Sequence, residues 1–376
     1  MPTNIYFVCD IIYLIEIEKI TQKGTVNMNS NIAQQNTITN IVFYHGGCLD
    51  GIGAAYCHFL YSGNGKKTKY VPMKHNEINV DAIKFKLSDV DLSLVEDVFV
   101  LDFNLNKSCY DYLWDSINPN MKVTVIDHHK TAKEEIETMK GDYANKNIVF
   151  HFNLNYSGAF LSYVYFAMFI QQNSSIADGS FEAFVDANQA GVPYWTRMIQ
   201  DRDLWRWKEK DTKAFTTALH SKVCNTENAH DYHNDNIPLE LDIVRQINLN
   251  DENSVTELIT IGNVMNEQYD NQIQSIMTNK GYFEVDFPLV GKGYAINANN
   301  LFSSELGSKL CRLDEQHKFA IVFCFSDNQN IKCSIRSTDD FDCSGIAKYF
   351  GGGGHPQASG FSLSFEQFQK YILGLS

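Results

Sequence analysis

Short runs of β-branched and aromatic residues alternate with longer amphipathic segments through the first half of the chain. Strands are predicted at 41–44, 69–73, 98–103, 123–126 and 148–152. Helices are predicted at 54–60, 108–117 and 157–171, and Gly191-Val192-Pro193 opens another that carries Asp201. Because strands that alternate with helices form parallel sheets covered on both faces, this half is predicted to be a doubly wound, mainly parallel α/β domain.

A second pattern follows a polar, His- and Asn-rich stretch at 214–253 that shows no apolar periodicity. A helix is predicted near Val255–Lys280, and strands at 281–285, 290–296, 319–325 and 331–337, before a glycine run and a final strand. This favours a smaller mixed α/β domain. The predicted organisation is an extension at 1–40, which either adds a helix or edge strand or is partly disordered, a first domain at 41–235, a linker at 236–254 and a second domain at 255–376.

The most apolar segment, Ile5–Ile20, is interrupted by Asp10, Glu16 and Glu18. It lacks the features of a secretory signal, and no apolar run reaches the roughly 18 residues of a membrane span. The nine cysteines form no CxxC pair, which favours reduced thiols over a zinc ribbon or a disulfide framework. We therefore expect a cytoplasmic protein without a membrane partner, located in the host cytoplasm if it is viral.

The 376 residues suggest two domains, and the charge balance narrows the class of partner. Lys plus Arg number 31 and Asp plus Glu number 45, which gives a formal net charge of −14. A strongly acidic protein does not coat long duplex nucleic acid through a broad basic face. A narrow cleft that admits a short phosphorylated end stays compatible with this charge.

Polar residues gather at the predicted strand ends. His45 and Asp50 follow the first strand, Asp102 ends the third, and Asp127-His128-His129 ends the fourth. Ligands of open parallel sheets bind at the carboxyl ends of the strands, and a set of carboxylates and imidazoles suits Mn²⁺ or Mg²⁺. A lone Asp at such a place is more often a turn or cap residue, and a His pair more often a surface loop. The coincidence at three strand ends favours a metal site, which Asp201 could join from its helix.

These residues resemble a known family. His45-Gly-Gly-Cys-Leu-Asp50-Gly, Val-Leu-Asp102, Val-Ile-Asp127-His128-His129 and Asp201 are similar to the four motifs of the DHH phosphoesterase superfamily. That superfamily includes RecJ-type exonucleases, nanoRNases, cyclic-dinucleotide phosphodiesterases and family II pyrophosphatases. The segment from Ile335-Arg336-Ser337 to Gly-Gly-Gly-Gly-His355 resembles the signature of the DHH-associated substrate-binding domain, so 41–235 would be the catalytic domain and 255–376 the substrate-binding domain.

The resemblance implies a role for each matching residue. Asp102 would bridge two divalent ions, with His45 on the first and Asp50, His128 and Asp201 on the second. Asp127 would orient an imidazole, and His129 would face the scissile phosphate as an electrophile or leaving-group acid. The remaining matches would bind the substrate's other phosphate or terminal nucleotide: Arg336, Gly352, Gly353, Gly354 and His355.

The first motif departs from the family pattern at Cys48, which falls near the position of an Asp in many members, in a loop that looks one residue short. Three interpretations are open. Cys48 reaches a metal as thiolate, or the first metal site is weak or empty, or Cys48 is simply a small buried residue of the loop.

The combined reading predicts a metal-dependent phosphoesterase that uses one or two Mn²⁺ or Mg²⁺ ions to hydrolyse phosphodiester or phosphomonoester bonds of short oligonucleotides or nucleotides. The alternatives are a hydrolase of pyrophosphate or short polyphosphate and a catalytically weakened nucleotide-binding regulator. A homodimer is a further possible assembly of the protein. Trp195, Trp205 and Trp207 near Asp201 are predicted to belong to the core rather than to stack on bases, and Arg202 could contact the site.

Overall fold

The computed structural model describes residues 37–62, 67–117, 120–139, 141–170, 179–224, 232–234, 236–287, 290–326 and 330–375. Nearly all of the predicted N-terminal extension, 1–40, therefore lies outside the described residues. Within them, no helix is long and apolar enough to cross a membrane.

The first half of the chain forms a five-stranded sheet in which every neighbouring pair is parallel. Its order is β2-β1-β3-β4-β5. The strands are β1 (Asn40–His45), β2 (Thr68–Met73), β3 (Asp97–Leu101), β4 (Lys122–Asp127) and β5 (Ile148–Phe152). The predicted parallel α/β domain is thus confirmed.

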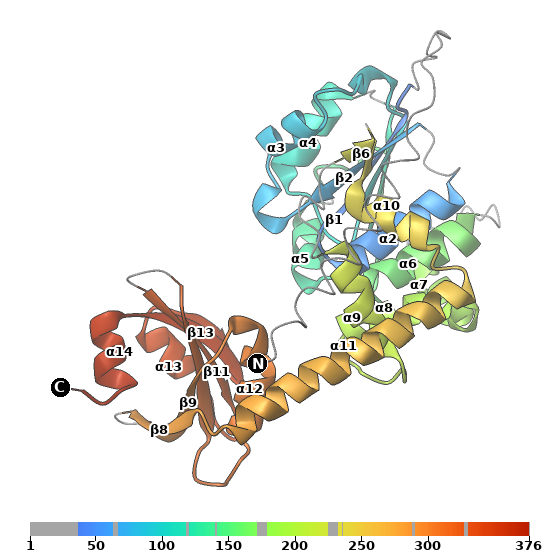
Figure 1. Cartoon of the computed structure of the whole chain (residues 1–376). Coiled ribbons are helices and arrows are strands. Elements are labelled where there is room, and N and C mark those ends of the chain that lie inside the picture. Colours follow the sequence, from blue (N-terminus) through green and yellow to red (C-terminus); the bar gives the residue numbers. More distant parts are fainter. Residues whose placement is uncertain are drawn as a thin grey trace, which may run out of the picture.

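Helices cover both faces of this sheet because its strands send apolar side chains to both sides (Figure 1). Val42 and Tyr44 belong to one core cluster, whereas Ile41 and Phe43 belong to the other. The helices that contribute to the first cluster include α2 (Leu49–Tyr61), α6 (Gly158–Tyr163), α7 (Gly179–Asn188), α8 (Tyr194–Asp203) and α9 (Thr212–Val223). Those that contribute to the second are α3 (Val80–Lys86), α4 (Lys107–Ser116) and α5 (Lys130–Met139).

The strand order places a potential ligand-binding crevice at the carboxyl ends of β1 and β3. From β1 the chain moves outward to β2, and then crosses back to place β3 on the other side of β1. At such a reversal the connections after neighbouring strands diverge, which leaves room for a ligand beyond the carboxyl ends of the strands. The predicted site residues follow β1, β3 and β4, so the fold positions them at this edge.

The stretch 214–253, predicted to be polar and to hold the linker at 236–254, contributes to the core instead. Phe215 and Leu219 of α9 are buried in the first core cluster, as are Leu241 and Val244 of α10 (Leu239–Ile247). The prediction that this stretch lacks apolar periodicity was therefore wrong. Within each helix these buried apolar residues stand three or four positions apart with polar residues between them, so the polar composition of the stretch hides their periodicity.

The second half forms a six-stranded mixed sheet ordered β12-β13-β11-β10-β9-β8, in which only β9 and β10 pair in parallel. Its strands are β8 (Tyr282–Phe287), β9 (Gly291–Asn297), β10 (Phe319–Phe325), β11 (Asn330–Ser337), β12 (Gly353–His355) and β13 (Ala358–Ser364). One core cluster includes α12 (Ser303–Leu310), and the other α13 (Ser344–Tyr349) and α14 (Phe365–Tyr371). The smaller mixed α/β domain is confirmed.

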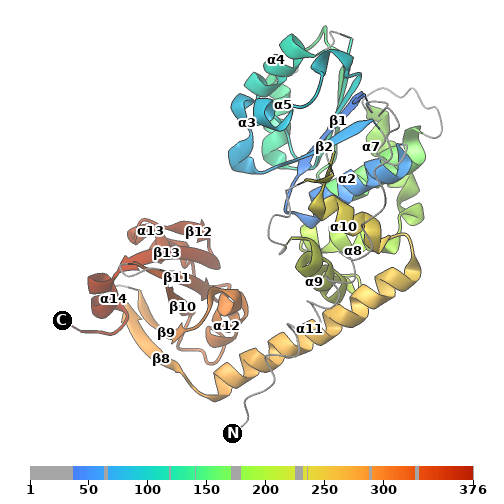
Figure 2. The ribbon, with the colours of Figure 1, turned by 45° about the horizontal axis from the view of Figure 1, so that its top comes forward.

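A single long helix, α11 (Glu252–Thr278), joins the two halves (Figures 1 and 2). Its start packs into the first half, where Val255 and Leu258 belong to the core. Its end packs against the second sheet through Ile273. The helix packs closely on α9 at Gly262. A Cβ at this position would lie 1.8 Å from the Ala214 carbonyl oxygen, so only glycine allows the approach.

Candidate metal centre

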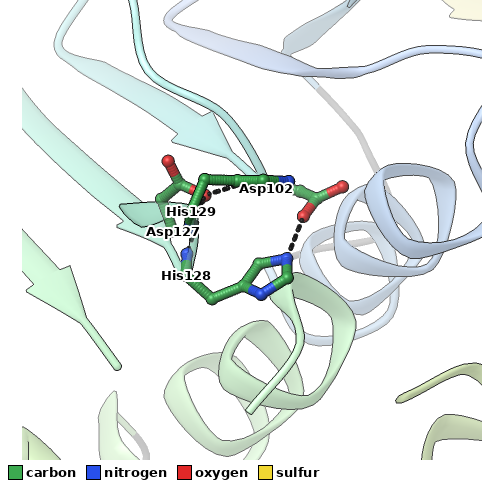
Figure 3. A group of neighbouring side chains, drawn as sticks. All are labelled: Asp102, Asp127, His128 and His129. Carbon is green, nitrogen blue, oxygen red and sulfur yellow. Dashed lines mark hydrogen bonds and ion pairs between the residues drawn. The ribbon is translucent and has the colours of Figure 1, made fainter. Parts of the chain in front are cut away.

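Three parallel strands deliver a group of polar side chains to one place, which we call the strand-end cluster: His45, Asp102, Asp127, His128 and His129. His45 is the last residue of β1, Asp102 follows β3 directly, and Asp127 ends β4. Figure 3 shows that Asp102 and His128 point toward one another from the ends of neighbouring strands. The strands are hydrophobic up to these residues, so the sheet itself fixes where the cluster lies.

Asp102 lies at the centre of the cluster. Its Oδ1 is 3.2 Å from His128 Nε2, and its Oδ2 is 3.5 Å from His45 Nδ1. The residue adopts a φ of 64°, in the left-handed region that non-glycine residues rarely occupy. Its neighbour Gly158 is required, since a Cβ there would lie 2.5 Å from Asp102 Oδ1. Such local strain is typical of functional positions.

The buried carboxylates of this site destabilise one another unless a cation lies between them. Asp102 is 1% exposed, and neither of its carboxylate oxygens has a hydrogen-bond partner among the described residues. Burial and the nearby Asp50 carboxylate raise the pKa of Asp102 well above its usual value. The same two causes raise the pKa of Asp203 to about 7. Buried carboxylates that face one another in this way fit a divalent cation, which would offset their repulsion and fill their open coordination.

Asp127 organises the loop that follows β4. Its Oδ1 accepts hydrogen bonds from the backbone N–H groups of His128 (2.7 Å) and His129 (3.2 Å), and lies 2.8 Å from Nδ1 of the His129 ring. This contact raises the pKa of His129, while burial lowers that of His128. A neutral His128 suits metal ligation, and a His129 held by a carboxylate suits proton transfer.

Asp50 enters the site from the first turn of α2. Its carboxylate accepts hydrogen bonds from the backbone N–H groups of Gly158 (2.6 Å) and Ala159 (2.9 Å), at the start of α6. Its Oδ2 also lies 3.5 Å from His128 Nε2. Asp50 therefore ties α2 to α6 and at the same time faces the strand-end cluster.

The structure does not bring Asp201 into the cluster. The Asp201 carboxylate accepts hydrogen bonds from the backbone N–H groups of Lys208 (2.8 Å) and Glu209 (3.0 Å) and from the Thr212 hydroxyl (2.6 Å). It anchors the loop between α8 and α9 instead.

Asp203, two residues further along α8, takes the position predicted for Asp201. Its Oδ2 lies 3.5 Å from His128 Nε2, and with Asp50 and His128 it forms a group whose potential ligand atoms lie within 4.8 Å of one another. Asp203 was not among the predicted ligands. The available signal was the pair of acids two apart on a helix, of which only one can face the sheet edge.

Cys48 lies beside the first strand end, at the N-cap of α2. Its Sγ belongs to a group with His45 and Asp102 whose potential ligand atoms are within 4.8 Å of one another. Burial, followed by the Asp50 charge, raises the pKa of the thiol to about 11. Cys48 is thus within reach of the position where the resemblance implies the first ion.

A pocket of about 410 Å³ opens at this edge. Its walls include His45, Cys48 and Asp50 from the sheet side, and Asp203 and Trp205 from the end of α8 and the following loop. Arg202, whose Nη1 donates to the Thr216 carbonyl oxygen (3.2 Å), also lines it. The pocket therefore combines acidic groups with a cation.

The predicted substrate-binding residues lie in the second sheet. Arg336 is on β11, where a Cβ at Gly307 of α12 would meet its Cγ at 2.7 Å. Gly352 precedes β12, and Gly353, Gly354 and His355 form this strand with their side-chain positions exposed. The pocket described above is lined by none of these residues. Their assignment to the substrate stays a prediction.

The three tryptophans near Asp201 differ in solvent exposure. Trp195 is 1% exposed and belongs to the first core cluster, as predicted. The prediction was wrong for Trp205 and Trp207, which are 74% and 41% exposed. Both follow the end of α8, where the helical spacing that suggested a core position no longer applies.

Comparison with known proteins gives a family match and two curated relatives. Residues 291–373 match the model of the DHHA1 domain. The chain is 27% identical over 354 residues to an uncharacterized protein of Acanthamoeba polyphaga mimivirus, covering 90% of this chain and 72% of that one. It is 23% identical over 335 residues to oligoribonuclease NrnB of Bacillus subtilis, covering 86% and 73%.

Among solved structures, the pGpG-specific phosphodiesterase PggH of Vibrio cholerae aligns at a TM-score of 0.43 with 11% identity, covering 89% of this chain and 96% of that one. The family assignment depends on the DHHA1 match and on the Asp-His-His triplet, which the fold places at the end of β4 beside Asp102. These features and the curated relatives point to the DHH phosphoesterase superfamily.

Proposed function

We propose that the protein is a divalent-metal-dependent phosphoesterase that hydrolyses phosphodiester or phosphomonoester bonds in short nucleotides or oligonucleotides. The observation that carries this proposal is the strand-end cluster, in which the buried oxygens of Asp102 and the ring nitrogen of His128 face one another without hydrogen-bond partners among the described residues. The relative NrnB, an oligoribonuclease, supports a nucleotide substrate.

The geometry supports the following ligand set. Asp102 would be shared between ions, with His45 and Cys48 on one side and Asp50, His128 and Asp203 on the other. Because this set is rich in oxygen and imidazole, we expect Mn²⁺ or Mg²⁺, one or two ions per chain. When bound, such ions supply a nucleophilic hydroxide near neutral pH and stabilise the charge on the phosphoryl oxygens.

The chain's own residues would complete the reaction. The Asp127 carboxylate holds Nδ1 of His129 at 2.8 Å and so leaves Nε2 to donate a proton to the departing oxygen. The Arg202 cation at the pocket wall would attract a phosphate. The pocket is small, so a short phosphorylated end fits the net charge of −14 better than a long strand does.

The proposal is tested by incubating the full chain with Mn²⁺ and a panel of dinucleotides, cyclic dinucleotides, 3′,5′-bisphosphorylated adenosine and pyrophosphate. We expect metal-dependent product from at least one nucleotide. Asp102→Asn should reduce this activity by about 10³-fold or more, because the shared carboxylate is lost. Asp81→Asn, at an exposed position in the first turn of α3, is the matched control and should leave activity unchanged.

Two outcomes would contradict the proposal. A complete lack of metal-dependent product would favour a nucleotide-binding regulator that has lost catalysis. Product from pyrophosphate alone would favour a pyrophosphate or short-polyphosphate hydrolase.

A further inference from the structure

The loop between α8 and α9, residues 204–211, carries two exposed indole rings beside the candidate metal centre. Trp205 and Trp207 are 74% and 41% exposed, and their ring centroids lie 4.9 Å apart in an edge-to-face arrangement. Trp205 also lines the pocket that contains His45, Cys48 and Asp203. Large aromatic side chains this exposed contribute little to folding. A pair of them beside a pocket is typical of a surface that binds a ligand.

The backbone holds this loop in a strained shape. Trp205 and Trp207 have φ values of 54° and 53°, a left-handed conformation that is unfavourable for bulky side chains. The Asp201 carboxylate fixes the loop by accepting hydrogen bonds from the N–H groups of Lys208 and Glu209, and the Asp201 carbonyl oxygen accepts from that of Arg206 (2.8 Å). The fold therefore maintains exposed tryptophans at a conformational cost, which is typical of functional loops.

The loop that carries the rings also carries two cations that could contact the phosphates of a ligand. The loop reads Trp205-Arg206-Trp207-Lys208, so a cation follows each ring. Arg206 and Lys208 line a second pocket of about 420 Å³ together with Arg197. Glu209 lies 3.3 Å from Arg197 and balances that cation, and Asp211 accepts a hydrogen bond from the Tyr194 hydroxyl (3.3 Å). Arg206 and Lys208 are therefore the cations on which such phosphate contacts depend.

We propose that Trp205 and Trp207 form a stacking platform for nucleobases of a short single-stranded oligonucleotide whose phosphate end enters the candidate metal centre. Aromatic faces stack on any base, and interleaved cations follow the phosphates, which together give sequence-tolerant binding of single strands. This inference depends on the proposed function, because the metal pocket supplies the reason for a phosphate to lie next to the rings. It adds the base as a recognised group, which a pyrophosphate substrate lacks.

Binding without turnover tests the platform. Fluorescence anisotropy of the full chain in EDTA compares a labelled pentanucleotide with an abasic pentamer that carries the same phosphates. We expect the base-bearing oligomer to bind about tenfold tighter or more. Trp205→Ala/Trp207→Ala should remove this difference, Trp205→Phe/Trp207→Phe should keep most of it, and Phe85→Ala, an exposed aromatic on α3, should leave it unchanged.

The outcomes separate this inference from the proposed function. Equal affinity for the two oligomers, or a base preference that survives the double alanine variant, would overturn the platform even if Mn²⁺-dependent hydrolysis is observed. A base preference that depends on the two tryptophans supports the platform even in a chain that hydrolyses nothing, and the failure would then belong to the proposed function alone.

Discussion

Two glycines at the candidate metal centre leave no room for a larger side chain. Gly158 has no room for a Cβ because Asp102 lies there, and its N–H donates to Asp50. Gly51 is equally confined, since a Cβ would lie 2.2 Å from the His45 carbonyl oxygen. Two glycines thus set the spacing of three predicted ligands.

Gly158→Ala tests this packing. We expect the added methyl group to displace Asp102, to lower stability by about 1–3 kcal/mol and to weaken Mn²⁺ binding at least tenfold. The free energy of unfolding and a calorimetric Mn²⁺ titration measure the two effects. Gly141→Ala is the matched control, because nothing lies within 4 Å of a Cβ at that position. Unchanged Mn²⁺ affinity in Gly158→Ala would contradict the arrangement.

The role of Cys48 in metal binding can be tested by replacing its thiol with a carboxylate. Cys48→Asp places a hard carboxylate beside His45 and Asp102, and we expect Mn²⁺ affinity to rise about tenfold, because Mn²⁺ prefers oxygen to sulfur ligands. Cys48→Ala serves as the comparison, and its Mn²⁺ affinity should not rise. An Asp variant that binds Mn²⁺ no better than the Ala variant would show that Cys48 only fills the loop.

At the scale of elements, helix α8 divides its two acids between different tasks. Asp201 anchors the loop that carries the exposed tryptophans, whereas Asp203 faces the strand-end cluster. Residues two apart on a helix point in nearly opposite directions, so one helix serves both the metal pocket and the loop.

Two matched substitutions separate these tasks. Asp203→Asn is expected to reduce Mn²⁺ affinity at least tenfold with little loss of stability, since Asp203 is partly exposed. Asp201→Asn is expected to lower stability by about 1–3 kcal/mol, because its new N–H₂ group cannot accept the backbone N–H bonds. Thermal unfolding and Mn²⁺ titration of both variants give the comparison, and the reverse pattern would restore Asp201 as the ligand.

For the whole molecule, two buried histidines make stability depend on pH. Burial lowers the pKa of His58 to about 3 and that of His151 to about 4. Both rings pack among aromatic side chains of the first domain, and His58 Nδ1 lies 2.8 Å from the Tyr70 hydroxyl. Each ring therefore stays neutral in the folded chain well below the pH at which it protonates in the unfolded chain.

The sign of the effect follows from proton linkage. The unfolded chain, with a histidine pKa near 6.5, takes up the proton first, so stability is lost as the pH falls from about 6.5 toward 3. His58 alone is expected to remove about 2 kcal/mol between pH 7 and pH 5. Urea unfolding at both pH values should show a smaller loss in His58→Gln than in the wild type. His355→Gln, at an exposed position, should match the wild type, and an equal loss in all three proteins would contradict the role of His58.

Local patterns in the chain predict the alternation of strands and helices, the mixed second domain and the polar residues at three strand ends. Each of these features can be recognised in a few consecutive residues. A strand buried on both faces appears as a continuous apolar run, and the polar residue that ends the strand follows it directly. The three-dimensional arrangement was needed to show that Asp203 rather than Asp201 faces His128, that α9 and α10 belong to the core, and that Trp205 and Trp207 are exposed. A helix pattern states which residues share a face but not what that face meets, since the partner comes from distant parts of the chain.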